Sequence, residues 1–400
     1  MTATNRTALK ITTVSMHTSP WTQLGAGDGG GMNVVVRHTA EELAQLGHQV
    51  EVVTRRTDPD TPERQQMAPG VELVTLTAGP AAHLPKSRID EHVESFRAGL
   101  AALEPGDVIH SHHWMSGVAA LPVAEQWQVP HAMSYHSIAA PQLHVDLGLG
   151  EPPESARRVP GEHLCAQRSD RVIAISAAEA DTVIERFGID PARVTVVAPG
   201  VDHDLFHPLA DQDTARADYL LFAARLQPLK GADLVVEALG LIDPAVRPRL
   251  VIAGEVSEDF ADYQAVIDEI IGRHDLADWV SYAGARPRQD FAALVRGAAL
   301  MVIPSHSETF GLVALESAAS GVPVVASAAG GLVESVAEGR SGHLMARRDP
   351  ALWAETITDL LADRDRLAAL GRSAHQWSLD FTWAASAARL ESVLVELVDR

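Results

Sequence analysis

The sequence has a single cysteine, few basic residues and no long apolar segment. Cys165 alone cannot form an intramolecular disulfide or a cysteine metal cluster, so we expect a small buried residue within a helix at residues 154–169. No apolar run approaches the ~18 residues of a membrane-spanning helix. The N-terminal segment, residues 1–10, is short and polar and does not resemble a signal peptide. These absences predict a cytoplasmic protein without a membrane partner.

Basic residues are also scarce relative to acidic ones. The chain has 32 Lys and Arg against 53 Asp and Glu, a formal net charge of −21. Nucleic acid and anionic membrane both require a basic face, so neither is expected as a partner. A local pair of cations is therefore more informative here than in a basic protein. The 400 residues, 46% of them hydrophobic, are enough for two domains.

Strand and helix patterns alternate along the whole chain, and the strands are fully apolar. This alternation predicts the α/β class, with two tandem doubly wound (Rossmann-like) parallel sheets covered on both faces. We predict an N-terminal acceptor-binding domain at residues 1–203, a C-terminal nucleotide-sugar-binding domain at 204–380, and a linker near 199–214. A last helix within residues 381–400 follows the second sheet and is expected to cross back to the first domain. The predicted strands lie near residues 9–16, 49–54, 72–76, 108–112, 132–136, 172–176, 194–198, 219–224, 250–254, 280–282, 300–304, 324–327 and 343–346.

Two glutamates frame a predicted strand-loop-helix junction at residues 304–321. Glu308 precedes the helix and Glu316 lies just over one turn inside it. The free amides at Gly311 and Leu312 form a site for anionic oxygen. The glutamates could then accept hydrogen bonds from hydroxyls on either side of a diphosphate. Two ordinary surface glutamates are the alternative, but polar residues crowd this end of the strand, where open α/β sheets bind ligands.

A second motif places two cations on the loop after the strand at 219–224. Arg225 and Lys230 lie five residues apart, and Gly231 begins the next helical pattern. Arginine can bridge two phosphate oxygens and lysine acts as a point charge, so the pair suits a diphosphate. A solvated surface pair is the alternative.

A glycine-rich segment near the N-terminus allows a different interpretation. Gly25–Gly30 fits G-x-G-x-x-G, and Glu51 could bind a ribose, as in a nicotinamide enzyme. That fingerprint requires its first glycine directly after the strand, whereas a loop of about ten residues intervenes here. We therefore interpret residues 29–31 as a close backbone approach to a diphosphate or an acceptor.

Together these features resemble the retaining glycosyltransferases of GT-B architecture, family four, over nearly the whole chain. Residues 15–34, 107–117, 225–231, 307–317 and 381–390 resemble the actinobacterial D-inositol 3-phosphate glycosyltransferases of mycothiol synthesis. The resemblance implies transfer of N-acetylglucosamine from UDP-GlcNAc to a small polar acceptor such as 1D-myo-inositol 3-phosphate. It also implies a homodimer, no cofactor and no metal. Catalysis would depend on positioning and charge stabilisation, with the leaving phosphate taking the acceptor proton.

The resemblance assigns roles to individual donor-site residues. Arg225 and Lys230 would hold the diphosphate, Glu316 the ribose, and Glu308 and His136 the transferred sugar. The catalytic residues are expected to be Arg225, Lys230, His136 and Glu308, and the donor-binding residues Gly31, Arg225, Lys230, Arg286, Glu308, Phe310, Gly311, Leu312 and Glu316.

The acceptor side departs from the family pattern. Asn33, Lys86, His113, Ser137 and Arg157 occupy the corresponding positions, but the family has tyrosine at His113 and threonine at Ser137. One alternative is therefore a paralogue of an actinobacterial natural-product (antibiotic) pathway, acting on an aminocyclitol or small thiol with a GDP-sugar donor. Another is a non-catalytic sugar-nucleotide binding protein, which the presence of both His136 and Glu308 disfavours.

Overall fold

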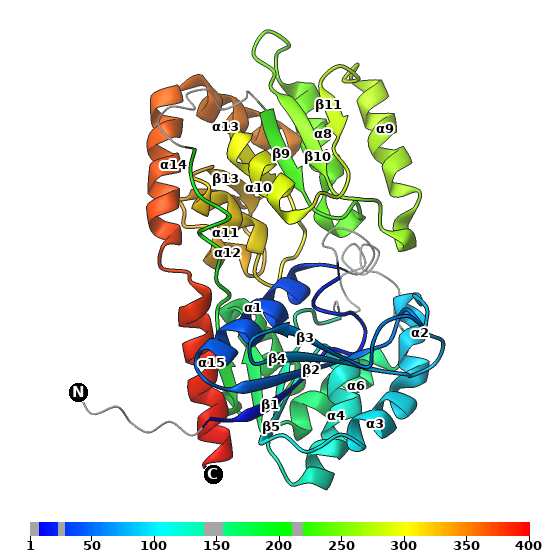
Figure 1. Cartoon of the computed structure of the whole chain (residues 1–400). Helices are drawn as coiled ribbons and strands as arrows, with labels where there is room; N and C mark the ends of the chain where they lie inside the picture. The colour runs from blue at the N-terminus through cyan, green and yellow to red at the C-terminus, as the bar shows by residue number, and fades with distance from the viewer. Residues whose placement is uncertain (1–7, 23–28, 140–154, 210–218) are drawn as a thin grey trace, which may run out of the picture.

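The protein consists of two α/β units stacked end to end (Figure 1). The computed structural model describes residues 8–22, 29–139, 155–209 and 219–400. Each unit has one sheet with helices on both faces, which is the predicted fold class. The predicted boundaries at 203 and 380 stay a prediction. Residues 210–214 of the predicted linker lie outside the described residues.

The first sheet has the strand order β3-β4-β2-β1-β5-β6-β7-β8. All of its pairs are parallel except β3 with β4. Its strands are β1 (Lys10–Val14), β2 (Gln49–Arg55), β3 (Arg64–Ala68), β4 (Val71–Leu76), β5 (Val108–His112), β6 (His131–Ser134), β7 (Arg171–Ala174) and β8 (Val194–Val196). Its helices are α1 (Gly31–Gln45), α2 (Lys86–Ile89), α3 (Val93–Ala101), α4 (Trp114–Trp127), α6 (Arg158–Arg168) and α7 (Ala177–Phe187).

Strand β3 was absent from the sequence-based prediction. It is an exposed antiparallel edge strand whose polar sequence RQQMA shows no apolar alternation, so the pattern on which strand prediction depends is missing. The other strands of this sheet were predicted within a few residues. Cys165 lies buried in α6, as expected.

The dinucleotide-binding interpretation fails on spacing, as argued from the sequence. Residues 15–30 separate β1 from α1. Gly25 and Gly27 lie outside the described residues. Glu51 accepts a hydrogen bond from Arg64 Nη1 at 3.0 Å, so this carboxylate has a structural partner at the sheet edge.

The second sheet is entirely parallel, with the order β11-β10-β9-β12-β13-β14. Two apolar clusters cover its two faces, which explains why its strands are apolar throughout. Its strands are β9 (Tyr219–Ala223), β10 (Arg249–Ala253), β11 (Val280–Tyr282), β12 (Leu300–Ile303), β13 (Val324–Ser327) and β14 (Gly342–Met345). Its helices are α8 (Ala232–Leu241), α9 (Tyr263–Arg273), α10 (Arg288–Gly297), α11 (Leu312–Ala319), α12 (Leu332–Ser335), α13 (Pro350–Ala362) and α14 (Arg364–Ser378).

The last helix, α15 (Trp383–Val398), crosses back to the first unit, as predicted (Figure 1, red). Leu390 and Leu394 are buried in the same apolar cluster as the residues of β1 and β2. Glu391 contributes a buried pair with His48, whose Nε2 lies 3.2 Å from Oε1. The helix therefore fastens the end of the chain to the first sheet. No helix in the described part of the chain is long and apolar enough to cross a bilayer.

Candidate active site

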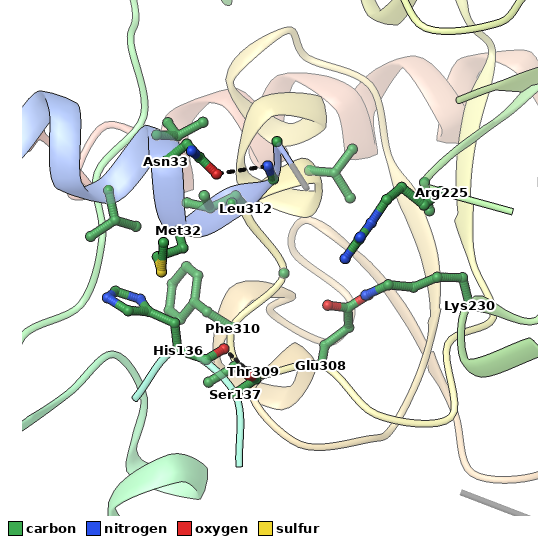
Figure 2. A pocket seen from close by; sticks show the side chains of 18 of the residues that line it. Met32, Asn33, His136, Ser137, Arg225, Lys230, Glu308, Thr309, Phe310 and Leu312 are labelled. Atoms are coloured by element: carbon green, nitrogen blue, oxygen red, sulfur yellow. Dashed lines mark hydrogen bonds and ion pairs between the residues drawn. The ribbon is translucent and has the colours of Figure 1, made fainter. Parts of the chain in front are cut away.

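A cavity of about 540 Å³ lies where the two units meet, within the size range of small-molecule sites. Residues that follow strands of both sheets line it, in keeping with the general position of ligands in open α/β sheets. Every residue nominated from the sequence lines this cavity except Arg157. Figure 2 shows Arg225, Lys230 and Glu308 converging on one side, and His136 and Ser137 on the other.

The residues predicted to bind the donor, among them Arg225, Lys230, Glu308 and Glu316, line one part of the cavity, which we call the donor half. Lys230 and Glu308 pair with each other there. Lys230 Nζ lies 2.7 Å from Glu308 Oε1, and Ser305 Oγ donates to the same oxygen at 2.8 Å. An ammonium group has three N–H donors, so Lys230 can keep this bond and still donate to a phosphate. Glu308 Oε2 then remains for a sugar hydroxyl. The pairing holds both side chains in place before any ligand binds.

Two helix N-termini face the cavity, one from each unit. Helix α11 begins after Gly311, and helix α1 begins at Gly31. The first amides of a helix have no intrahelical acceptor and, together with the helix dipole, attract anions. Gly311 has φ +95°, and a Cβ there would lie 2.6 Å from Leu332 Cδ2, so only glycine fits this cap. Phe310 and Leu312, on either side of it, also line the cavity.

Glu316 is buried and has a partner that the sequence analysis missed. Arg288 donates from Nη2 to Glu316 Oε1, and its guanidinium lies 4.6 Å from the centre of the Phe206 ring. A buried carboxylate requires such compensation. Arg286, which was nominated, lines the same wall. The spacing Arg-Pro-Arg could have indicated both arginines.

The part of the cavity lined by Lys86, His113 and Ser137, which we call the acceptor half, also contains Arg158 but not Arg157. The Arg157 side chain is 68% exposed, and its Nη1 lies 3.7 Å from Asp90 Oδ2. Arg158 is 7% exposed and bonds Glu162 Oε1 through Nε at 2.8 Å. Neighbouring residues of a helix point about 100° apart, so only one of the two arginines can face inward.

Ser137 and Asn33 both line the cavity, but more hydrogen bonds hold the side chain of Asn33 than that of Ser137. Ser137 Oγ accepts from Arg158 Nη2 at 3.4 Å. Asn33 is 1% exposed, and its amide nitrogen donates to Thr18 Oγ1 and to the carbonyl of Ser19 at 3.0 and 2.7 Å. Its Oδ1 accepts from the amide of Gly30. Asn33 therefore holds the start of α1, and a contact with the acceptor would compete with these bonds.

A group of buried histidines lies behind the acceptor half. The His113 ring is 4.2 Å from that of His17, and His113 has φ +72°. The rings of His110 and His112 are 4.1 Å apart, and His112 stacks with His136 at 5.1 Å. Burial lowers the pKa of His110 to about 4 and that of His136 to about 3, so both are neutral near pH 7.

Hydrogen bonds between the two units meet at the loop that carries Glu308. Thr309 Oγ1 donates to the carbonyl of His136 at 2.8 Å, and Ser176 Oγ donates to the carbonyl of Thr309 at 2.7 Å. The Glu334 carboxylate accepts from the first two amides of α7 at 2.9 and 3.0 Å. These direct hydrogen bonds fix the position of one half of the cavity relative to the other.

Comparison with known proteins shows the family to which this chain belongs. The sequence profile described as "Family 4 Glycosyltransferase in conflict systems" matches residues 23–390. The chain belongs to glycosyltransferase family 4. This family 4 glycosyltransferase is 40% identical to a D-inositol 3-phosphate glycosyltransferase of Thermobispora bispora, over 100% of this chain and 97% of the relative. It is 41% identical to one of Frankia alni, over 93% and 96%. It is a nucleotide-sugar-dependent enzyme.

Solved structures agree with the GT-B architecture. The family 4 glycosyltransferase matches sucrose-phosphate synthase of Thermosynechococcus elongatus with a TM-score of 0.87, 27% identity and coverage of 98% of this chain and 99% of the other. Anabaena HepE in complex with UDP and glucose matches with a TM-score of 0.75, 20% identity and coverage of 96% and 99%. At 20% identity the second likeness shows the fold alone.

Proposed function

We propose that the enzyme transfers N-acetylglucosamine from UDP-GlcNAc to 1D-myo-inositol 3-phosphate with retention of configuration. The observation that carries the proposal is that cations from both units line one cavity. Arg225 and Lys230 come from the second unit, and Lys86 and Arg158 from the first. A diphosphate donor and a phosphorylated acceptor require two such anion sites. The names of the Thermobispora and Frankia relatives support this acceptor.

Charge stabilisation at the diphosphate would supply most of the catalysis. As the bond between the sugar and the β-phosphate breaks, negative charge grows on the phosphate oxygen. Arg225, Lys230 and the start of α11 line the cavity and would face that oxygen, and preorganised donors of this kind stabilise developing charge. The leaving oxygen then accepts the proton of the attacking hydroxyl. No covalent intermediate and no metal are needed in this scheme.

The acceptor phosphate would lie against Lys86 and Arg158. Charge-assisted hydrogen bonds from arginine to phosphate are short and directional. The bond from Arg158 Nε to Glu162 fixes the guanidinium, so its Nη atoms are oriented before the acceptor binds. Ser137, hydrogen-bonded to Arg158, would add a neutral donor. A homodimer remains a prediction for this enzyme.

The direct test is a transfer assay with purified enzyme. UDP-GlcNAc is incubated with inositol 3-phosphate, with inositol, or without acceptor, and the products are followed by mass spectrometry. We expect a product only with the phosphorylated acceptor, and an α-linkage by proton NMR. GDP-GlcNAc serves as the matched donor control. Equal transfer to inositol and inositol 3-phosphate would remove the acceptor-phosphate site from the proposal, while the family assignment would stand.

A further inference from the structure

The backbone of His136 is held by groups from other parts of the fold. Its carbonyl accepts from Thr309 of the second unit at 2.8 Å (Figure 2). The neighbouring Glu179 carboxylate accepts from the amide of Ile175 at 2.7 Å, and the His136 amide beside it favours its charged form. His136 has φ +59°, a left-handed conformation that is uncommon for residues other than glycine. Such a conformation persists only where the surroundings fix it, so rotation of the ring is the main freedom left.

The ring of His136 is held by His112, the last residue of β5. His112 Nδ1 lies 2.8 Å from His136 Nε2, and His112 is 2% exposed. Burial lowers the pKa of His136 to about 3 and that of His112 well below its usual value, so both rings are neutral near pH 7. One proton must therefore lie between the two nitrogens, donated by one ring and accepted by the other.

Access to the cavity decides which ring donates. His112 Nε2 is buried and has no hydrogen-bond partner among the described residues. If His136 donated, His112 would carry its own proton on Nε2, leaving a buried N–H without an acceptor. If His112 donates from Nδ1, its Nε2 is only an unused lone pair. The proton of His136 then lies on Nδ1, in a residue that lines the cavity, where a ligand can accept from it. An N–H at His112 Nε2 would have no such ligand, because His112 does not line the cavity, so donation from His112 is favoured.

We propose that His112 is a positioning residue that donates from Nδ1 to His136 Nε2 and so makes His136 Nδ1 a hydrogen-bond donor toward the substrate. His136 lines the cavity, and its Nδ1 is buried without a partner in the part of the chain that the structure describes. A buried polar atom of this kind calls for a ligand, and a sugar hydroxyl oxygen would accept from it. The inference rests on the proposed function, in which His136 contacts the transferred sugar.

The kinetic test compares two substitutions at His112. In His112→Leu the ring of His136 loses its hydrogen-bond partner. We expect kcat to fall about tenfold or more, with little change in donor KM. This decrease in kcat is somewhat smaller than the one expected for removing a direct transition-state donor. In His112→Asn the side-chain amide can donate in place of Nδ1, and kcat should stay within about threefold of wild type. His131→Leu is the matched control, because His131 is equally buried in the same sheet but its ring bonds only Ser111 and Ser169 among the described residues.

The tautomer itself is measured by long-range proton–nitrogen NMR on protein with labelled histidine. The signals of His136 are identified by their loss in His136→Asn. We expect the neutral Nδ1–H form in wild type and in His112→Asn, and a shift toward the Nε2–H form in His112→Leu. This measurement needs no substrate and does not depend on the stability of the Leu variant.

The outcomes separate the two proposals. An Nε2–H form of His136 in wild type, or normal kcat in His112→Leu, would overturn the positioning role of His112. Normal transfer by His136→Ala would instead show that His136 takes no part in the reaction, and the proposed contact with the sugar would fail whatever the tautomer.

Discussion

The donor half and the acceptor half of the cavity are built differently. The donor half takes its charged groups from the segments that directly follow strands β9, β11 and β12 of one sheet, and the partners are close: Lys230 with Glu308, and Arg288 with Glu316. The acceptor half gathers single residues from many elements of the first unit and sets them against buried neutral histidines. A motif contained in one loop can be recognised from spacing, whereas a wall assembled from separate elements cannot.

The largest effect is expected where developing charge is stabilised in the donor half. Arg225→Ala or Lys230→Ala should lower kcat by about 10²-fold or more, the scale for losing a transition-state donor. Arg273→Ala is the control, because Arg273 is an exposed cation of the same unit that pairs with Glu237 at 2.7 Å. Steady-state kinetics with saturating donor measure the effect. Turnover near wild type in either variant would contradict the diphosphate role.

A strong effect on the acceptor alone should follow from Arg158→Ala. We expect acceptor KM to rise about tenfold or more, because a charge-assisted bond to phosphate is lost, while donor KM stays nearly constant. Arg157→Ala is the matched neighbour, and its acceptor KM should change little because the side chain is largely exposed. If the two variants behaved in the opposite way, the inward-facing arginine would be misassigned.

Arg158→Ala also leaves the buried Glu162 without its cation, and burial already raises the pKa of that carboxyl. The double variant with Glu162→Gln removes this carboxylate charge. Its acceptor KM should match that of Arg158→Ala, which separates phosphate binding from local stability.

A smaller decrease in kcat is expected when a contact between the two units is removed. Glu334→Ala removes two hydrogen bonds to the start of α7, so the two walls should lose part of their alignment, and kcat should fall by about threefold to tenfold. Glu355→Ala on the exposed face of α13 is the control. An unchanged kcat in Glu334→Ala would show that the remaining contacts at Thr309 suffice to align the cavity.

No effect at all is expected from chelation. Cations and helix amides are assigned to the diphosphate, so transfer in EDTA should equal transfer in its absence. The initial rate is compared before and after dialysis against chelator and after adding back Mg²⁺ or Mn²⁺. Loss of activity that the metal restores would mean that a divalent ion does part of the work given to Arg225 and Lys230.

The architecture and the donor motifs can be predicted from the amino-acid pattern alone. Apolar strands in regular alternation with helices are typical of buried parallel strands. This pattern can be recognised in the sequence without knowing which residues are in contact. Edge strand β3 was not predicted, because its residues are polar and exposed. The E-x₇-E and R-x₄-K spacings were sufficient to place Glu308, Glu316, Arg225 and Lys230 on one cavity, because each motif follows a single strand of the same sheet.

The make-up of the acceptor half follows from tertiary contacts. Adjacent arginines are equivalent in a sequence, and the orientation of α6 turns Arg158 inward and Arg157 outward. The contact between His112 and His136 joins residues 24 positions apart across neighbouring strands, and the bond from Thr309 to His136 spans 173 positions. Spacing along the chain carries no information about such contacts. They follow from strand order and from the way the two units face each other.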